Sequence, residues 1–305
     1  MILSTLNLGW VSPLLKPKFM VQNHKYMIEN VIDTHVHVWD FDQADYPWLE
    51  GDTTLLNRTY ALEELEPARI RAGVTEGVLV QAANNREDTD WMLRVAARNG
   101  WIRGVVGWLP LQDPAATAMI LEREYTSGSM LKGVRHLIHN EADPAWLLQA
   151  PVLESLGLLA ARDVPYDVVG VIPAHLRTAL RVAEKWPGLR LVLDHLNQPP
   201  IGRPGEEKEW RELMTAAAGH ENIYVKVSGL GTVDLEPWIE FALHHFGAGR
   251  VFCGGDWPVC LLAGSYEKTW AAYRGLLDRY LNQEERDKVF RSNAQRFYKL
   301  PERGL

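Results

Sequence analysis

Two histidines placed two residues apart form the most chemically informative pattern in this sequence. His35 and His37 lie in the apolar run Ile32-Asp33-Thr34-His35-Val36-His37-Val38. Side chains of a β-strand alternate between its two faces, so both imidazoles and Asp33 point the same way. Neutral imidazole is a good zinc ligand, and we therefore predict that His35 and His37 bind a metal. The alternative, two histidines on the solvent face of an edge strand, stays open for this segment alone.

A carboxylate near the other end of the chain has a similar setting. Asp256 follows a short apolar run and the pair Gly254-Gly255, and Pro258 stops the segment. The glycines leave room for a close approach to the backbone. We predict that Asp256 is the general base that takes a proton from water, and that it is also a metal ligand. An aspartate that only caps the next turn is the alternative.

A third polar group stands at the end of another apolar run, Leu191-Val192-Leu193-Asp194-His195. We predict that His195 takes part in catalysis and completes or borders the metal site. A histidine satisfied by hydrogen bonds in the core would give the same pattern.

Three cationic or imidazole side chains interrupt apolar strands. Lys226 is the clearest, because a buried lysine without a partner is costly and should meet an anion, a carbonyl or a carboxylate. We predict that Lys226 is catalytic and that Arg135 and His136 bind substrate. An internal salt bridge of Lys226 with Asp194 or Asp33 is the alternative.

Four of the 12 tryptophans lie beside predicted strand ends. A flat indole can cover the face of a sugar ring, although most aromatic side chains simply pack in the core or at the rim. The predicted substrate contacts are Trp39, Trp48, Trp108 and Trp257.

The fold prediction rests on a regular alternation of strands and helices. The strand-like runs end near His37, Gln81, Leu109, Ile138, Val169, His195, Ser228 and Asp256. Helical patterns between them include residues 88–98, 114–125 and 173–185. Eight such strands predict a single-domain (β/α)8 TIM barrel, in which the chemistry lies at the carboxyl ends of the strands.

Length and composition agree with one barrel in a chain of 305 residues. Residues 1–30 are expected to be an N-terminal extension without the features of a signal peptide, and residues 31–305 to form the barrel. A net charge of −7 suggests neither nucleic acid nor a membrane as a partner. Two cysteines are consistent with a cytoplasmic location, and a homo-oligomer stays open.

In combination and order, these motifs resemble the amidohydrolase superfamily. The chain is most similar to the family-2 branch, which includes the fuconolactone, rhamnonolactone and pyrone dicarboxylate lactonases. The matching segments are Ile32 to Trp39, Tyr46 to Leu49, Val80 to Ala82, Val105 to Trp108, Gly133 to His136, Leu193 to Leu196, Val225 to Leu230, Gly254 to Pro258 and Asn293 to Tyr298. The resemblance implies a (β/α)8 barrel in which the last-strand aspartate directs water and a metal, where present, lies by the first-strand histidines.

Departures from the wider superfamily limit the metal content. The fourth strand ends in Arg135-His136-Leu137-Ile138, without the bridging lysine or glutamate of two-metal members, and Val164 to Val171 contains no histidine. We therefore expect the chain to bind one divalent metal ion, with zinc as the leading candidate, or no metal at all. His175, which follows Pro173 at a helix start, is expected on the surface.

The leading hypothesis is a hydrolase that opens a small-molecule lactone of a sugar acid or related organic acid. A single divalent metal or cationic side chains would polarise the carbonyl group. A metal-dependent decarboxylase on the same scaffold, and a barrel that binds ligand without catalysis, are the alternatives.

Overall fold

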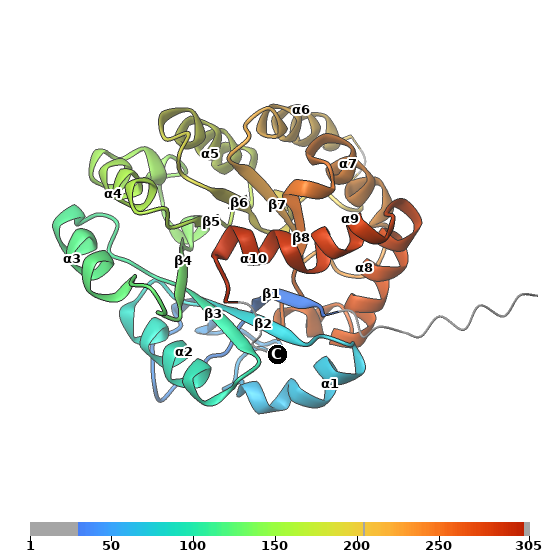
Figure 1. The fold of residues 1–305 in the computed structure, drawn as a ribbon, viewed down its shortest axis with the longest axis horizontal. Coiled ribbons are helices and arrows are strands. Elements are labelled where there is room, and N and C mark those ends of the chain that lie inside the picture. Colours follow the sequence, from blue (N-terminus) through green and yellow to red (C-terminus); the bar gives the residue numbers. More distant parts are fainter. Residues whose placement is uncertain (1–29, 204, 302–305) are drawn as a thin grey trace, which may run out of the picture.

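Eight parallel strands form one sheet in the order β1 to β8 in the computed structural model (Figure 1). The structure describes residues 30–203 and 205–301, so the predicted N-terminal extension lies outside the described residues except for Asn30. The strands are β1 Ile32–Val36, β2 Glu76–Val80, β3 Ile102–Gly107, β4 Leu131–His136, β5 Tyr166–Val168, β6 Leu191–Leu193, β7 Ile223–Val227 and β8 Val251–Cys253.

The sheet closes between its first and last strands. The Asp256 amide donates to the His35 carbonyl at 2.8 Å, and the His37 amide donates to the Trp257 carbonyl at 2.7 Å. The predicted (β/α)8 barrel is thereby confirmed. Every strand ends slightly before the predicted point, by one residue in β1 (Val36 against His37) and by three in β8 (Cys253 against Asp256). The polar residues that marked the strand ends therefore lie just beyond the last strand hydrogen bonds.

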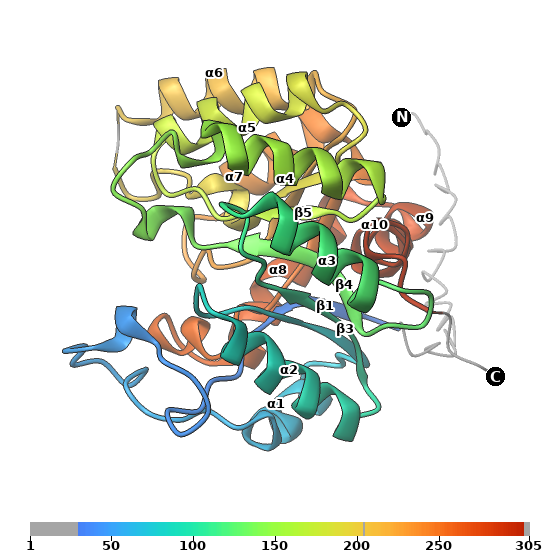
Figure 2. The ribbon, with the colours of Figure 1, turned by 90° about the vertical axis from the view of Figure 1, so that its left-hand side faces the viewer.

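Within the described residues, eight helices surround the barrel on the outside, and two more follow the eighth of them (Figures 1 and 2). They are α1 Glu66–Arg71, α2 Arg86–Arg98, α3 Pro114–Glu124, α4 Ala150–Ala161, α5 Pro173–Lys185, α6 Glu207–Ala218, α7 Glu236–Phe246, α8 Tyr266–Tyr280, α9 Gln283–Asp287 and α10 Asn293–Tyr298. The Asn85 side chain caps α2 and the Asp113 side chain caps α3, which explains why these two helices are legible in the sequence.

The inside of the barrel contains an apolar layer covered by α10. Phe297 and Tyr298 from this helix pack against Ile32, Val192 and Phe252 from the strands. Figure 2 shows α10 at one side of the barrel, whereas the long segment between β1 and α1 projects from the opposite side. Because α10 covers one end, the polar residues beyond the strands open toward the other.

His175 differs from its predicted place, since it is buried with only 3% exposure. It lies on the face of α5 that also buries Leu176, Ala179 and Val182, and its Nδ1 accepts a hydrogen bond from the Val171 amide at 3.2 Å. Whether a side chain near the start of a helix faces the core depends on its place in the 3.6-residue helical repeat, and not on its distance from the helix end.

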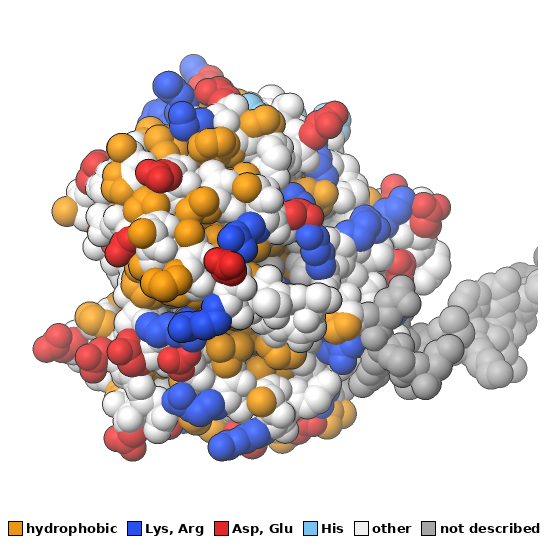
Figure 3. Space-filling model, turned by 60° about the vertical axis from the view of Figure 1, so that its left-hand side comes forward, with side chains coloured by type: hydrophobic (Ala, Val, Ile, Leu, Met, Phe, Trp, Pro, Cys, Tyr) orange, Lys and Arg blue, Asp and Glu red, His pale blue; other side chains and the backbone are white. Residues whose placement is uncertain are grey.

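The surface carries charges of both signs. Acidic and basic side chains are interspersed with apolar ones over the face in Figure 3. Of the helices in the part of the chain that the structure describes, none is both long enough and apolar enough to span a membrane.

Candidate active site

A cavity of about 240 Å³ opens at the carboxyl ends of the strands. Six of the predicted site residues line it, one from β4 and the others from the segments that follow β1, β6 and β8. They are His37, Trp39, Trp48, Arg135, His195 and Asp256. The structure therefore brings together residues that lie more than 200 positions apart in the chain.

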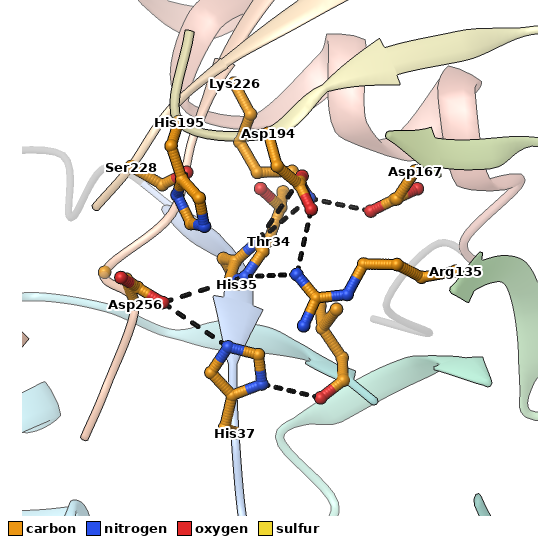
Figure 4. Close-up of polar contacts among 12 residues, drawn as sticks. Thr34, His35, His37, Arg135, Asp167, Asp194, His195, Lys226, Ser228 and Asp256 are labelled. Carbon is orange, nitrogen blue, oxygen red and sulfur yellow. Dashed lines mark hydrogen bonds and ion pairs between the residues drawn. The ribbon is translucent and has the colours of Figure 1, made fainter. Parts of the chain in front are cut away.

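His37 presents an unprotonated nitrogen to this cavity. Its Nδ1 lies 2.7 Å from the Val80 carbonyl oxygen, which can only accept a hydrogen bond, so Nδ1 carries the proton when the ring is neutral. Nε2 then has a lone pair and lies 3.4 Å from Oδ1 of Asp256 (Figure 4). Two lone pairs that face each other at this distance favour a proton or a cation between them.

The backbone around Asp256 needs its two preceding glycines. A Cβ atom on Gly254 would lie 2.4 Å from the Cβ of His35, and one on Gly255 would lie 2.5 Å from Oδ2 of Asp33. The Gly255 amide donates to Asp33, which also accepts from the Tyr266 hydroxyl at 2.6 Å. This close approach of β8 to β1 points the Asp256 carboxylate toward His35 and His37.

His195 reaches the same point from the opposite wall. It begins a run of positive φ angles after β6, and Ser228 Oγ lies 2.9 Å from its Nδ1. A Cβ on Gly229 would lie 2.4 Å from this nitrogen, so the ring fits against bare backbone. Donor atoms of His35, His195 and Asp256 all lie within 4.8 Å of one another, and these three residues form a candidate metal-binding group.

A layer of paired charges lies deeper in the barrel (Figure 4). Lys226 Nζ lies 2.8 Å from both Asp167 Oδ2 and Asp194 Oδ1, and Arg135 Nη1 donates to Asp194 Oδ2 at 3.0 Å. Burial favours the neutral acid of Asp194, but Lys226, His35 and Arg135 outweigh it and hold the pKa of Asp194 well below its usual range. The internal salt bridge of Lys226 with Asp194, one of the two alternatives from the sequence, is therefore present, whereas Asp33 is not a partner.

His35 connects the two levels. Burial, together with Lys226, lowers the pKa of His35 well below its usual value, so the ring is neutral. Its Nδ1 lies 3.2 Å from Lys226 Nζ, and its Nε2 lies 3.1 Å from Arg135 Nη1 and 3.7 Å from Asp256 Oδ1. A neutral imidazole has one lone pair. With the proton on Nδ1, which also faces Asp194 Oδ1 at 3.5 Å, Arg135 and a bound cation would compete for the lone pair of Nε2.

Trp108 and His136 are absent from the residues that line the cavity. The Trp108 indole donates to Nδ1 of His136 at 3.0 Å, and Nε2 of His136 lies 2.6 Å from Glu141 Oε1. The His136 ring also stacks on Trp146 with ring centroids 3.9 Å apart. The hydrogen bonds of Trp108 and His136 with each other and with Glu141 therefore hold these two predicted substrate contacts outside the cavity lining.

Of the other tryptophans, two line the cavity and one packs away from it. Trp39 and Trp48 meet edge to face at 5.3 Å, and the Trp48 indole donates to the Ala82 carbonyl at 2.7 Å. Trp257 instead packs against Tyr60 and is 3% exposed. Of the four predicted tryptophans, the two that line the cavity are therefore Trp39 and Trp48.

Sequence reasoning missed three residues that shape the site. His139 and Gln198 line the cavity, and Asp167 holds Lys226 below it. Burial and the nearby Arg135 charge lower the pKa of His139 to about 4, so it is neutral near pH 7. Of these three residues, only Asp167 left a signal in the sequence. It places a carboxylate in the middle of the strand Tyr166–Val168, just as Lys226 places a cation in β7.

The chain matches known proteins over most of its length. The family model described as amidohydrolase matches residues 32–300. Two relatives called L-fucono-1,5-lactonase are similar to it: one from Burkholderia ambifaria is 34% identical over 88% of this chain and 95% of the relative, and one from Burkholderia multivorans is 30% identical over 89% and 96%.

Solved structures agree with this similarity. A crystal structure of an amidohydrolase from Burkholderia multivorans with bound zinc has a TM-score of 0.82 and 30% identity, over 89% of this chain and all of the other. A 5-carboxyvanillate decarboxylase from Novosphingobium aromaticivorans has a TM-score of 0.63 with 16% identity over 89% of this chain and 96% of the other, a likeness that shows the fold alone.

Proposed function

Since the chain belongs to the amidohydrolase family, we propose that this protein is a lactonase that opens the ring of an uncharged sugar-acid lactone. The observation that carries the proposal is the convergence of a carboxylate oxygen of Asp256 with Nε2 of His37 and with His195 in one small cavity. The lactonase relatives, each covered over at least 95% of its length, support the same reaction class.

Asp256 is the proposed general base. Its carboxylate takes a proton from water while the water oxygen bonds to the lactone carbonyl carbon, which gives a tetrahedral oxyanion. The oxyanion then collapses, the bond from this carbon to the ring oxygen breaks, and the leaving oxygen takes the proton from Asp256. The product is the hydroxy acid, and Asp256 returns to its starting state.

Arg135 is the proposed cation for the developing oxyanion. It lines the cavity, is 3% exposed, and is oriented by Asp194 and by Gln81, whose Oε1 accepts from Arg135 Nε at 3.1 Å. A fixed guanidinium in a buried site stabilises negative charge without reorganisation. Lys226 does not line the cavity, so we reassign it from catalysis to holding Asp167 and Asp194 in place.

The donor set fits one divalent metal ion. His35, His195 and Asp256 would hold it, His37 would border it, and this set of imidazoles and a carboxylate is typical of zinc sites. The zinc-bound relative supports the choice of metal. A bound zinc ion would supply a Lewis acid for the carbonyl oxygen.

The charges that line the cavity favour an uncharged ring. Arg135 and Asp256 are the charged side chains among the described lining residues, and Arg135 is already paired with Asp194. Because Arg135 is assigned to the oxyanion, a carboxylate elsewhere on the substrate would face Asp256 without a second lysine or arginine among the described lining residues. The half-buried Trp48 offers an aromatic face to a substrate ring, whereas Trp39 is fully buried behind it. The preference for aldonolactones over pyrone dicarboxylates and aromatic carboxylates therefore rests on the charges that line the cavity.

We also retain the cytoplasm as the proposed location. Both cysteines are free and buried, as is typical of a reducing compartment.

A lactone panel tests the proposed function. Aldonolactones, muconolactones and pyrone carboxylates are mixed with the purified protein and a pH indicator, with and without chelator, and carbon dioxide is measured from aromatic carboxylates. We expect acid release that is fastest with aldonolactones. No acid release from any lactone, or carbon dioxide release instead, would contradict the proposal.

A further inference from the structure

A second cavity lies beside the catalytic one. It has a volume of about 120 Å³ and is formed by the β5–α5 loop, α5, the turn after β6, and α6. Val171 and Gln198 line both cavities, so these two side chains are the partition between them. None of the proposed reacting groups lines the second cavity.

The backbone after β6 gives the partition its shape. His195, Leu196, Asn197 and Gln198 have φ angles of 55°, 50°, 53° and 50°, and the Gln198 amide closes this left-handed turn on the His195 carbonyl at 2.9 Å. Residues other than glycine rarely adopt this conformation in succession. The turn places His195 in the catalytic cavity, Asn197 in the second cavity and Gln198 in both.

Most of the side chains that line the second cavity are apolar. The uncharged polar ones are Gln198 and Asn197, whose buried Oδ1 has no hydrogen-bond partner among the described residues and lies against Gly170. Ile172, Leu176, Pro200 and Leu213 contribute aliphatic surface, and Trp210 contributes its ring because its indole N–H is already bonded to the Leu196 carbonyl at 2.9 Å. Arg203 and Glu206, which are exposed, form an ion pair in which Nη1 lies 2.9 Å from Oε2. Such a lining favours an uncharged, apolar group and offers no unpaired charge to an ionic one.

The rim between the two cavities is also apolar. Val171, which lines both cavities, is 39% exposed, and Ile172 next to it is 42% exposed. Gln198 is exposed, and exposed side chains change rotamer quickly, so its movement opens a path between the cavities.

We propose that the second cavity is a subsite for a short, uncharged alkyl chain carried by the lactone ring. This inference rests on the proposed lactonase function. A volume of about 120 Å³ holds about four groups of the size of a water molecule, each about 30 Å³. The preferred chain therefore has about four carbon atoms.

A chain-length series tests the subsite. The probes are γ-butyrolactone and its derivatives with methyl, propyl, butyl and hexyl chains on the ring carbon that bears the ring oxygen, with aldonolactones assayed in parallel. We expect kcat/KM to rise by up to about fourfold for each added methylene group as far as butyl, and no further for hexyl. A flat or falling series from the parent protein would overturn the inference.

Two variants fill the cavity without touching the reacting groups. Ile172→Trp at the exposed rim and Leu213→Trp on α6 should each remove the gain from the butyl chain and leave unsubstituted γ-butyrolactone unchanged. Ile70→Trp, at a 61% exposed position on α1, is the matched control. If both folded variants keep the full butyl preference, the chain binds elsewhere and the inference is wrong.

The two proposals fail in different ways. Turnover of aldonolactones without any chain-length preference would remove the subsite and keep the lactonase. Absence of turnover with every lactone, including aldonolactones, would overturn the lactonase itself.

Discussion

Two levels of the barrel interior carry charged groups, and they differ in how those groups are paired. In the deeper level Lys226, Asp167 and Asp194 are fully buried, and Lys226 lies 2.8 Å from each carboxylate. In the upper level His37 and Asp256 are slightly exposed and face each other at 3.4 Å with lone pairs on both sides. The deeper charges are paired with one another, whereas the upper groups are left to bind a water, a proton or a cation.

This difference distinguishes the deeper residues, which hold the site in place, from the upper residues, which are proposed to take part in the reaction. A buried ion pair is held in place because loss of either partner leaves an uncompensated charge. Its stable geometry lets Asp194 orient Arg135 and face Nδ1 of His35 at 3.5 Å. The upper groups then meet substrate with their positions already set, which is the condition for electrostatic catalysis.

Removal of the proposed base should have the largest effect on rate. Asp256→Asn keeps the shape of the side chain and removes its basicity, so we expect kcat to fall by about two to four orders of magnitude with a smaller change in KM. Steady-state kinetics on an aldonolactone check this. Near-normal kcat in the folded variant would refute the assignment of the base.

Removal of the deep cation should have its main effect on stability. Lys226→Met leaves Asp167 and Asp194 buried without their shared partner, and we expect the free energy of unfolding to fall by about 3–5 kcal/mol. Urea unfolding measures the change. Lys208→Met, a change of the same chemistry at an exposed lysine of α6, is the control and should cost little.

A shift of the left-handed turn should lower the rate without removing a reacting group. A Cβ on Gly170 would lie 2.1 Å from Oδ1 of Asn197, so Gly170→Ala must displace the turn that carries His195. We expect a fall in kcat of about ten- to a hundredfold.

The displaced turn should be rescued by a second change. Asn197→Gly removes the clashing oxygen and tolerates a positive φ, so Gly170→Ala with Asn197→Gly should recover most of the lost kcat. Gly188→Ala, where nothing lies within 4 Å, is the matched control. Equal kcat in the single and double variants would show that the turn does not position His195.

The smallest effect is expected at the cavity wall. Trp48→Phe keeps an aromatic face and removes the indole N–H that donates to the Ala82 carbonyl. Loss of one such hydrogen bond costs about 1 kcal/mol, so we expect KM to rise by up to about fivefold at nearly constant kcat. A large fall in kcat instead would place Trp48 in the reaction itself.

The barrel and the upper level of the site follow from local patterns in the sequence. Each strand is a short, mostly apolar run, and His37, His195 and Asp256 follow strand ends within one to three residues, so the fold alone brings them to one cavity. His139 also lies three residues beyond its strand, but in the 3₁₀ turn Ile138–Asn140, where strand periodicity no longer indicates direction.

Gln198 and Asp167 depend on geometry that the sequence does not indicate. The left-handed turn that places Gln198 contains no glycine, which is the residue that normally marks positive φ. Asp167 lies in the middle of a three-residue strand, and its partners Lys226 and Tyr298 lie 59 and 131 positions away. Only the closed barrel shows that these groups meet.

A matched pair of variants tests the separation of the two levels most directly. Asp256→Asn and Asp167→Asn make the same chemical change, one in each level, and kcat and the free energy of unfolding are measured for both. We predict that Asp256→Asn loses at least about a hundredfold in kcat with stability nearly unchanged, and that Asp167→Asn loses about 1–3 kcal/mol of stability with less than about a tenfold change in kcat. The reverse pattern, or equal losses of rate in the two folded proteins, would contradict the account.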